Sequence, residues 1–296
     1  MTAVLAGSSV GVIGPGRVGT ALASALAARN IAVSAVAGRP SAPVRSGAVE
    51  RFLAAVPDAQ PLRPAGVAER CDMILLTVGD DALEDVARDL AAADVVRPGS
   101  YWIHTSGRHG KEALRAIAAA GGRIAACHPA QTFPTPAAGR QALSGAAWAV
   151  TAAAQDRPWA HAFVAALDGD AVDVREDDRV RYHAGLTVGS NGTSAVVSLA
   201  RDLLLAAGIT APDRFLAPLV TRSAANAADL GAAALTGPVR RGDGQTVEAH
   251  LRDLRAVLPE AVPAYRALAD LALSYARRAG LDEARATAIR TILDTE

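Results

Sequence analysis

Short, uninterrupted apolar runs alternate with segments of helical spacing over residues 1–175 of this 296-residue chain. Uninterrupted runs are typical of strands that are buried on both faces of a parallel sheet, whereas apolar residues three or four positions apart indicate helices. The alternation therefore predicts an α/β domain built on a doubly wound, mostly parallel sheet. The expected strands are residues 10–13, 31–37, 73–78, 101–104, 124–127, 146–151 and 171–174, and the expected helices are residues 20–29, 82–92, 111–120 and 157–167.

Beyond residue 179 the strand pattern is absent and only helical spacing remains. Gly208, the Gly237-Pro238 pair and Gly280 interrupt this spacing, as is typical of helix ends. We therefore predict two domains, an α/β domain over residues 1–175 and an all-helical domain over residues 176–296. The expected helices of the second domain are residues 179–207, 213–234, 246–257, 259–279 and 282–293.

A glycine-rich turn follows the first expected strand. Gly14, Gly16 and Gly19 have the G-x-G-x-x-G spacing, and a helix is expected directly after them. In a Rossmann-type sheet the first glycine allows a tight turn, the second lets the backbone approach a pyrophosphate, and the third lets the helix pack closely on the strand. The free N–H groups at the start of the helix then face the anion. The sequence thus predicts a dinucleotide site that includes Gly14, Pro15, Gly16, Arg17, Val18 and Gly19.

The end of the second expected strand indicates which dinucleotide binds. An Asp or Glu at this point would bind the ribose 2′-hydroxyl of NAD. No acidic residue occurs between Gly19 and Glu50, and Arg39 stands at this point with Ser41 beside it. Because a guanidinium favours the additional 2′-phosphate of NADP, we expect Arg39 and Ser41 to bind NADP(H). An exposed loop arginine without this role is the alternative.

Three later strands are expected to end at the same edge of the sheet as the glycine turn. His128 ends the third of these strands, and the following Pro129 favours an extended geometry that directs the imidazole out of the sheet. A histidine at a strand end could instead bond only to a neighbouring loop. The turns expected beside the cofactor are Val78, Gly79 and Asp80 and then His104, Thr105 and Ser106.

Hydride transfer to a carbonyl requires a proton donor beside the developing alkoxide. In the expected helix 179–207, His183 and Ser190 lie about 20° apart at 100° per residue, with Asn191 on the flank of this stripe. Polar side chains on a largely apolar helix are costly unless they are satisfied, which a wet substrate cleft or hydrogen bonds to other helices would achieve. We predict His128, His183 and Asn191 as catalytic residues and Ser190 as a substrate-binding residue.

Residues 235–244 are the only long polar turn expected in the second half. Guanidinium groups and the backbone N–H groups of a glycine-rich turn suit the capture of an anion. We therefore expect this turn to bind the substrate, although a flexible surface loop would have the same composition. The residues assigned to the substrate are Thr236, Arg241 and Asp243.

The chain carries 30 basic and 30 acidic residues, so its composition indicates no surface for nucleic acid or membranes. No apolar segment would cross a bilayer uninterrupted, and the segment before the first strand is too short for a signal peptide, so we expect a cytoplasmic protein. Cys71 and Cys127 lie in or beside apolar runs and are expected to be buried thiols. No metal site is predicted.

Five segments together resemble a bacterial family of reductases in which a Rossmann-like domain precedes a helical domain of unknown function, within the 6-phosphogluconate dehydrogenase superfamily. The resemblance spans nearly the whole chain. One branch of the family is similar to ketopantoate reductase, which implies reduction of 2-dehydropantoate with NADPH. The segments are GPGRVG at 14–19, HTSG at 104–107, HPAQTF at 128–133, YHAGLTVGSN at 182–191 and LTGPVRRGD at 235–243.

One position departs from the wider superfamily. If Asn191 corresponds to the helix asparagine of its ketopantoate and β-hydroxyacid enzymes, Thr187 stands where those enzymes have a lysine. The ammonium general acid would then be missing, and a histidine or a hydroxyl-bound water would have to donate the proton. The same absence suits imine reduction, because an iminium accepts hydride without a separate acid. Pyrroline-carboxylate reductases share this two-domain layout and also lack the lysine.

We therefore interpret the chain as an NADP-dependent oxidoreductase that reduces a small 2-keto acid, with 2-dehydropantoate as the first candidate and CH–OH donors preferred over CH–NH donors. The alternatives are an imine reductase resembling pyrroline-5-carboxylate reductase and a non-catalytic NADP(H)-binding regulatory protein. Helices this rich in Ala and Leu would expose much apolar surface on a lone domain. We therefore also expect a homodimer that forms through the helical domain.

Overall fold

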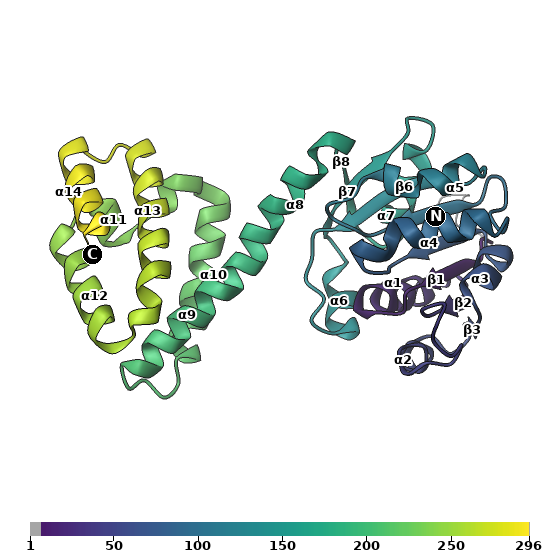
Figure 1. The fold of residues 1–296 in the computed structure, drawn as a ribbon, viewed down its shortest axis with the longest axis horizontal. Helices are drawn as coiled ribbons and strands as arrows, with labels where there is room; N and C mark the ends of the chain where they lie inside the picture. The colour runs from purple at the N-terminus through teal and green to yellow at the C-terminus, as the bar shows by residue number, and fades with distance from the viewer. Residues whose placement is uncertain (1–6, 296) are drawn as a thin grey trace. The chain divides into compact units, whose positions relative to one another are not determined.

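The computed structural model describes residues 7–295, which form two compact units that divide between Ser190 and Asn191. The strands of the first unit are β1 (Val10–Ile13), β2 (Val33–Ala37), β3 (Gln60–Pro61), β4 (Met73–Leu76), β5 (Tyr101–His104), β6 (Arg123–Pro129), β7 (Ala147–Ala152) and β8 (Asp170–Asp173). They form one eight-stranded sheet in the order β3-β2-β1-β4-β5-β6-β7-β8 (Figure 1). Strand β7 is antiparallel to β6, and every other neighbouring pair is parallel. The predicted doubly wound, mostly parallel sheet is thus confirmed.

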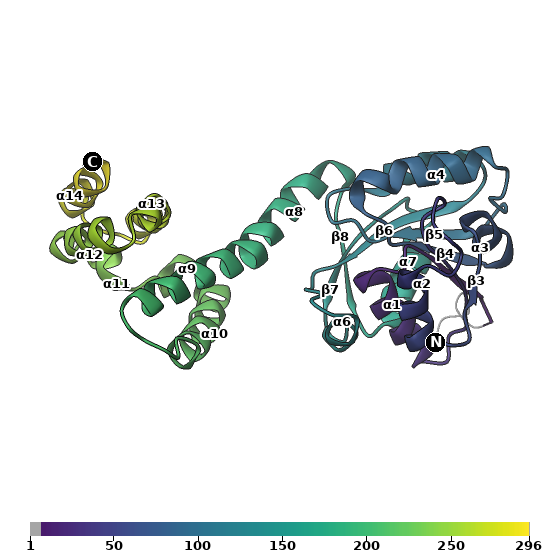
Figure 2. The same ribbon diagram turned by 60° about the horizontal axis from the view of Figure 1, so that its bottom comes forward.

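Helices cover both faces of this sheet (Figure 2). The α-helices of the first unit are α1 (Arg17–Ala27), α2 (Gly47–Ala55), α3 (Pro64–Arg70), α4 (Leu83–Ala92), α5 (Arg115–Ala119), α6 (Pro136–Ala142), α7 (Arg157–Ala166) and α8 (Arg179–Thr187). On one face α1 and α7 bury Leu22 and Phe163, and on the other α3 and α4 bury Val67 and Leu90. Because both faces are buried, the central strands β1 and β4 are apolar along their whole length.

The apolar pattern gave no indication of α2, β3, α3 and α6. Helices α3 and α6 have seven residues each, and β3 has two. Two helical turns carry too few apolar positions to show a period, and two residues cannot show the alternation of a strand. The pairing of β3 with β2 therefore depends on neighbours that are distant in the sequence.

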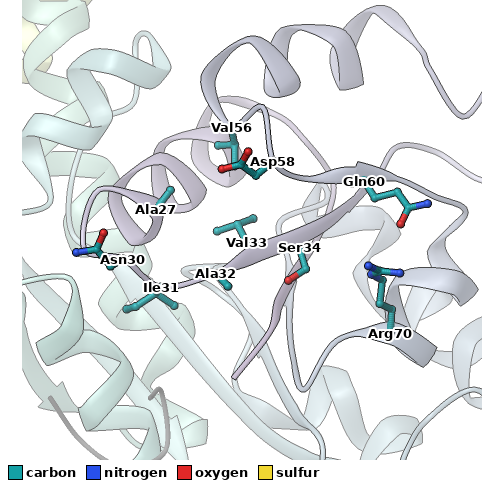
Figure 3. A pocket seen from close by; sticks show the side chains of 10 residues that line it. All are labelled: Ala27, Asn30, Ile31, Ala32, Val33, Ser34, Val56, Asp58, Gln60 and Arg70. Atoms are coloured by element: carbon teal, nitrogen blue, oxygen red, sulfur yellow. The ribbon is translucent and has the colours of Figure 1, made fainter. Parts of the chain in front are cut away.

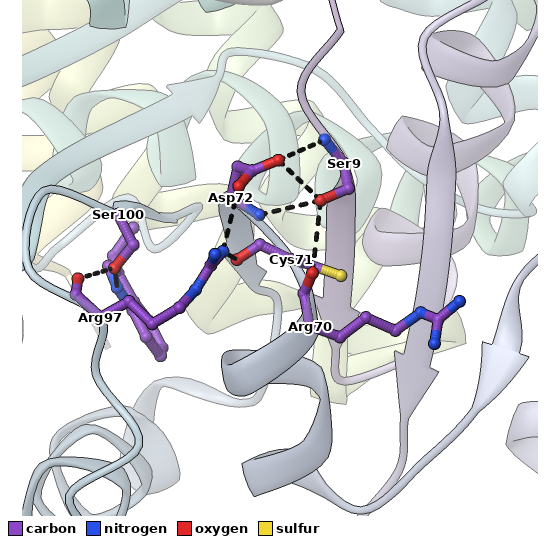
Figure 4. A network of polar contacts seen from close by, with 7 residues as sticks. Ser9, Arg70, Cys71, Asp72, Arg97 and Ser100 are labelled. Carbon is purple, nitrogen blue, oxygen red and sulfur yellow. Dashed lines mark hydrogen bonds and ion pairs between the residues drawn. The ribbon is translucent and has the colours of Figure 1, made fainter.

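A polar network holds the amino ends of β1 and β4 together (Figure 4). Asp72 accepts hydrogen bonds from the backbone N–H and the hydroxyl of Ser9, at 2.9 and 2.8 Å. Arg97 donates to the other carboxylate oxygen at 3.1 Å and to the carbonyl of Cys71. The hydrogen bonds, above all that from the Ser9 backbone, hold the pKa of Asp72 below its ordinary value. Hydrogen bonds and an ion pair within the protein therefore hold the amino ends of β1 and β4 together.

The second unit is helical throughout its described residues, as the sequence predicts. Its α-helices are α9 (Thr193–Ala206), α10 (Asp213–Leu230), α11 (Gly237–Arg241), α12 (Gly244–Val257), α13 (Val262–Arg278) and α14 (Glu283–Asp294). Val247, Leu251, Leu273 and Ile289 form the centre of its core. By contrast, α9 and α10 have no buried residue. Among residues 7–295, no helix combines the length and apolarity that crossing a membrane requires.

The single long helix expected over residues 179–207 is interrupted by a π-helical segment, Val188–Gly192, between α8 and α9. The two compact units divide inside this segment, one helix later than the boundary at 175/176 expected from the sequence. Helix α8 packs with the first unit because Arg179 at its start is buried and hydrogen-bonded to the sheet.

Candidate functional site

The glycine turn between β1 and α1 has the geometry that a phosphate-binding turn requires. Gly14 has a φ of +102°, and a Cβ there would lie 2.7 Å from the backbone of Thr77. A Cβ on Gly19 would lie 2.4 Å from Thr77 Oγ1 and 2.6 Å from the carbonyl oxygen of Gly14. A Cβ on Gly16 would meet no atom within 4 Å. The packing of the protein thus requires the first and third glycines, and open space lies in front of the second.

The start of α1 can accept an anion. No side chain caps this helix of 11 residues, and its first turn contains no acidic residue. The helix follows β1, which lies beside β4 where the strand order reverses, and doubly wound sheets bind ligands at this switch point. Unpaired N–H groups and the positive end of the helix dipole attract phosphate oxygens. The residues present therefore fit the pyrophosphate of a dinucleotide.

Arg39 and Ser41 follow β2 and are exposed, and Arg39 forms no ion pair among the described residues. A second arginine, which the sequence reasoning missed, supports this turn. Arg63 Nη1 donates to the carbonyl oxygens of Pro40 at 2.6 Å and of Ala42 at 2.7 Å. The turn is thereby held in one conformation, with two guanidinium groups at the end of β2. No sequence motif marks Arg63.

The turns after β4 and β5 are tied to one another. Arg108 Nε lies 3.3 Å from a carboxylate oxygen of Asp80. Val78 and Thr105 are half-buried, and Gly79 is exposed. The ion pair engages Asp80 within the protein, while these neighbours remain accessible at the carboxyl edge of the sheet.

His104 does not face this edge with its side chain, which corrects the expectation for its imidazole. The ring is fully buried, with Nε2 2.8 Å from the carbonyl oxygen of Gly110, and Nδ1 accepts from the backbone N–H of Ser106 at 3.2 Å. Burial lowers the pKa of His104 to about 3, and the bond to Gly110 opposes this change. A neutral His104 therefore shapes the turn that follows β5. Ser106 is itself buried in that turn.

The tertiary structure brings His128 and His183 together and places Tyr182 in contact with His128. His128 ends β6, and its Nδ1 lies 2.8 Å from the hydroxyl of Tyr182 on α8. The rings of His128 and His183 are edge-to-face, with centroids 6.0 Å apart. Gly107 lies against both rings, since a Cβ there would be 3.1 Å from each Nε2 and 2.4 Å from Cδ2 of His183. The ring nitrogens of His183 have no hydrogen-bond partner in the described chain.

Electrostatics make the His128–Tyr182 pair neutral. Burial lowers the pKa of His128 to about 4, with smaller contributions from Arg179 and His183, and Asp80 opposes the change. Burial raises the pKa of Tyr182 above its ordinary value, which the charge of Arg179 opposes. At neutral pH the pair therefore holds a phenol and an uncharged imidazole, and such a pair can release a proton and recover it. The only sequence feature that could have indicated Tyr182 is its position next to His183.

The other assigned residues lie in the π-helical segment or the second unit. Ser190 and Asn191 both belong to the π-helical segment. A π turn contains more residues than an α turn, so the value of 100° per residue that aligned them with His183 does not hold. Thr236 is exposed and directly precedes α11.

The segment 235–244 is not the open polar turn expected, because residues 237–241 form α11. The carboxylate of Asp243 caps α12, accepting from the backbone N–H of Thr246 at 3.1 Å and from the Thr246 hydroxyl at 2.7 Å, and its part in substrate binding stays a prediction. It also lies 3.7 Å from Arg241 Nη2, whose side chain is largely exposed. Asp243 thus stabilises the helix, whereas Arg241 remains available to an anion.

A well-formed cavity elsewhere in the first unit is not part of this arrangement (Figure 3). It has a volume of about 560 Å³ and is lined by Ile31, Val33 and Gln60 among others. Ile31 and Val33 lie at the amino end of β2 and Gln60 begins β3, whereas the glycine turn lies at the carboxyl end of β1. In the described part of the chain, no group of His, Cys, Asp and Glu side chains could hold a metal ion.

Two family models match the chain. The model of a Rossmann-like domain matches residues 4–129, and the model of a domain of unknown function, DUF2520, matches residues 146–287. The predicted Rossmann-like domain followed by a domain of unknown function is thereby confirmed. A comparison with curated protein sequences finds no match.

Several solved structures have the same fold. A candidate NADP oxidoreductase from Bacteroides fragilis has a TM-score of 0.74 at 20% identity, covering 90% of this chain and 97% of the other. A reductive aminase from Aspergillus terreus, in complex with NADPH and ethyl-5-oxohexanoate, has a TM-score of 0.64 at 16% identity, covering 96% and 99%. Pyrroline carboxylate reductase from Plasmodium falciparum, with NADP bound, has a TM-score of 0.57 at 12% identity, covering 97% and 99%. At these identities the similarity establishes the fold.

Proposed function

Because a Rossmann-like domain is followed here by a DUF2520 domain, we propose that the chain is an NADPH-dependent reductase of a small 2-keto acid, with 2-dehydropantoate as the first substrate to test. One observation carries this proposal. His128, Tyr182 and His183 meet at the carboxyl edge of the sheet whose glycine turn fits a pyrophosphate. Structural neighbours solved with NADP or NADPH support the choice of cofactor.

The chain's own residues would hold both the pyrophosphate and the 2′-phosphate of the cofactor. The N–H groups of Arg17 and Val18, at the start of α1, bind the pyrophosphate over Gly16. Arg39 binds the 2′-phosphate, on a turn that Arg63 holds in place. When bound, NADPH supplies a hydride.

The substrate oxygen needs a proton, and Tyr182 provides a donor that the sequence reasoning missed. Its hydroxyl retains the proton at neutral pH, because burial raises its pKa. His128, bonded to that hydroxyl through Nδ1, can return a proton from Nδ1 to the oxygen of Tyr182 while Nε2 takes up a proton from solvent. His183 lies beside the pair and orients the substrate oxygen. Ser190, the last residue of the first unit, is proposed to orient the carbonyl. For Asn191, Thr236 and Arg241 of the second unit, a role in substrate binding stays a prediction.

The test measures NADPH oxidation with 2-dehydropantoate and a panel of 2-keto acids, in the wild type and in Tyr182→Phe. Loss of a general acid lowers the rate by roughly 10²- to 10⁴-fold, while the affinity for NADPH stays unchanged. Tyr265→Phe is a matched control, because Tyr265 forms the same 2.8 Å hydrogen bond with His250 in the second unit. Binding of NADPH without turnover of any keto acid or imine would favour a non-catalytic NADP(H)-binding protein and contradict the proposal.

Imine reduction is the second candidate, favoured by Thr187 at the position of the superfamily's lysine and by the similarity in fold to a reductive aminase. Cyclic imines in the same assay separate the two reactions. An iminium accepts hydride without a proton donor, so Tyr182→Phe should spare imine reduction and impair keto-acid reduction. Activity with imines alone would decide for the second candidate.

We also propose that the chain forms a homodimer through its helical domain. Helices α9 and α10 have no buried residue, although both carry large apolar side chains. Phe215, Leu219 and Leu230 on α10 are each about 60% exposed. Exposed large apolar side chains gathered on one pair of helices are typical of a protein interface, and a second copy of the same helices would bury them.

A further inference from the structure

Arg179, the first residue of α8, is buried beneath the candidate site with only 1% of its surface exposed. A guanidinium has five N–H donors, and each one here has an acceptor. Nε donates to Thr151 Oγ1 at 2.8 Å, and Nη2 donates to the carbonyl oxygens of Ala126 at 2.9 Å and Ala149 at 3.1 Å. Nη1 donates to the carbonyl oxygens of Ser106 at 3.4 Å and Gly107 at 3.5 Å.

All five acceptors are uncharged, so hydrogen bonds satisfy the donors but no carboxylate neutralises the charge. The nearest candidate, Glu176, is engaged elsewhere. Its carboxylate accepts from the backbone N–H of Lys111 at 2.9 Å and of Glu112 at 3.3 Å. Among the described residues Arg179 forms no ion pair. Burying a charge without a counterion is costly, and a neutral side chain would avoid the cost.

The placement of this charge shows what it can do. Its guanidinium carbon lies 5.9 Å from the centre of the Tyr182 ring, one helical turn along α8. Ala149, which it binds on β7, is the residue paired with His128 on β6. Gly107, which it also binds, lies against the rings of His128 and His183. The Arg179 side chain thus contacts the three segments that carry the candidate site, which are β6, the turn after β5 and α8.

We propose that Arg179 is the positioning residue of this site and its fixed positive charge, which selects a substrate that carries a negative charge next to the reacting carbonyl. The proposal rests on the proposed reductase function. A positive charge in a water-poor site attracts a carboxylate and the developing alkoxide more strongly than it would in water. A 2-keto acid would therefore be preferred over its neutral ester.

The same charge acts on the groups around it. His128 is faced by Arg179, Tyr182 and His183 from α8 and by Asp80 from the turn after β4. Of these, Arg179 and His183 lower the pKa of His128, and Asp80 raises it. Removing the charge of Arg179 should therefore raise the pKa of His128 in the free protein.

The experiment compares Arg179→Gln, which removes the charge, with Arg179→Lys, which keeps it and loses the planar array of donors. Arg181→Gln is the matched control, because Arg181 lies on the same helix and is exposed. The pKa of His128 is measured by NMR on the full chain without substrate. The ratio of kcat/KM for 2-oxo-3-methylbutanoate to that for its methyl ester is measured in parallel.

We expect Arg179→Gln to raise the pKa of His128 by roughly one unit and to lower the acid-to-ester ratio about tenfold. Arg179→Lys should retain a low pKa and most of the preference, and Arg181→Gln should change neither. An unchanged acid-to-ester ratio together with an unchanged pKa of His128 in Arg179→Gln would overturn the proposal. An equal loss of the acid-to-ester preference in Arg179→Lys and Arg179→Gln would also overturn it.

Two features keep the test decisive. If Arg179→Gln does not fold, the wild type still answers, because an acid-to-ester ratio near one would contradict a fixed charge that selects a carboxylate. If the wild type reduces no substrate, the proposed function fails, and the NMR titration still decides whether Arg179 sets the charge of His128.

Discussion

Replacing Gly107 by alanine should disable the candidate site and leave the cofactor turn intact. The φ of Gly107 lies outside the left-handed region, so alanine is compatible with the backbone, and any effect comes from the added Cβ. That Cβ would lie 2.4 Å from Cδ2 of His183 and 3.1 Å from Nε2 of His128. Neither ring can stay where it is.

The magnitude follows from these distances. An ordinary contact begins near 3.4 Å, so the His183 ring would have to retreat by about 1 Å. A displacement of about 1 Å in a catalytic group lowers a rate by roughly 100-fold. Forcing one methyl group into a packed site also destabilises the fold by about 1–3 kcal/mol.

The assay measures kcat/KM for the best substrate, the Kd for NADPH and the free energy of unfolding in urea. Gly185→Ala is the matched control, because Gly185 lies on α8 beside the same site and its Cβ would meet no atom within 4 Å. In a helix this exchange stabilises the fold by about 0.5–1 kcal/mol. Full activity in Gly107→Ala would refute the placement of the two rings around this residue. A raised Kd for NADPH would show that the substitution also disturbs the cofactor turn.

Further predictions concern the cofactor, the pH dependence of stability and the oligomeric state. Arg39→Ala should weaken NADPH binding roughly 10- to 100-fold and spare NADH in a calorimetric titration, and equal losses for both would exclude a 2′-phosphate contact. Burial lowers the pKa of His104 to about 3 and of His128 to about 4, so below about pH 6.5 the unfolded chain binds more protons than the folded one. The stabilisation from the neutral rings is complete above about pH 6.5 and is lost as the pH falls, by up to about 1.4 kcal/mol per pH unit for each histidine. Urea midpoints that do not change down to about pH 4.5 would argue against this loss of stability. Phe215→Glu combined with Leu219→Glu should convert a sedimenting dimer into a monomer, and a wild type that is already monomeric at micromolar concentration would end the dimer proposal.

The sequence by itself determined the layers of the first unit and the start of the cofactor site. Strands β1 and β4 are buried on both faces, so each is an uninterrupted apolar run that the sequence displays directly. The strand-turn-helix order that marks Gly14 and Gly19 is local, although the contacts that require these glycines come from Thr77, which follows β4. Arg39 could be assigned because the end of β2 is a fixed place in such a sheet.

Only the tertiary structure decided which polar groups meet. His128 and Tyr182 come from β6 and α8, and no periodicity relates residues on separate elements. The π-helical segment invalidated the angular argument for Ser190 and Asn191, because the number of residues per turn was assumed and not observed. Burial made His104 a structural residue and left Arg179 charged within the protein. Local sequence sets backbone preferences, whereas burial and partners, which set the charge of a side chain, depend on residues that folding alone brings together.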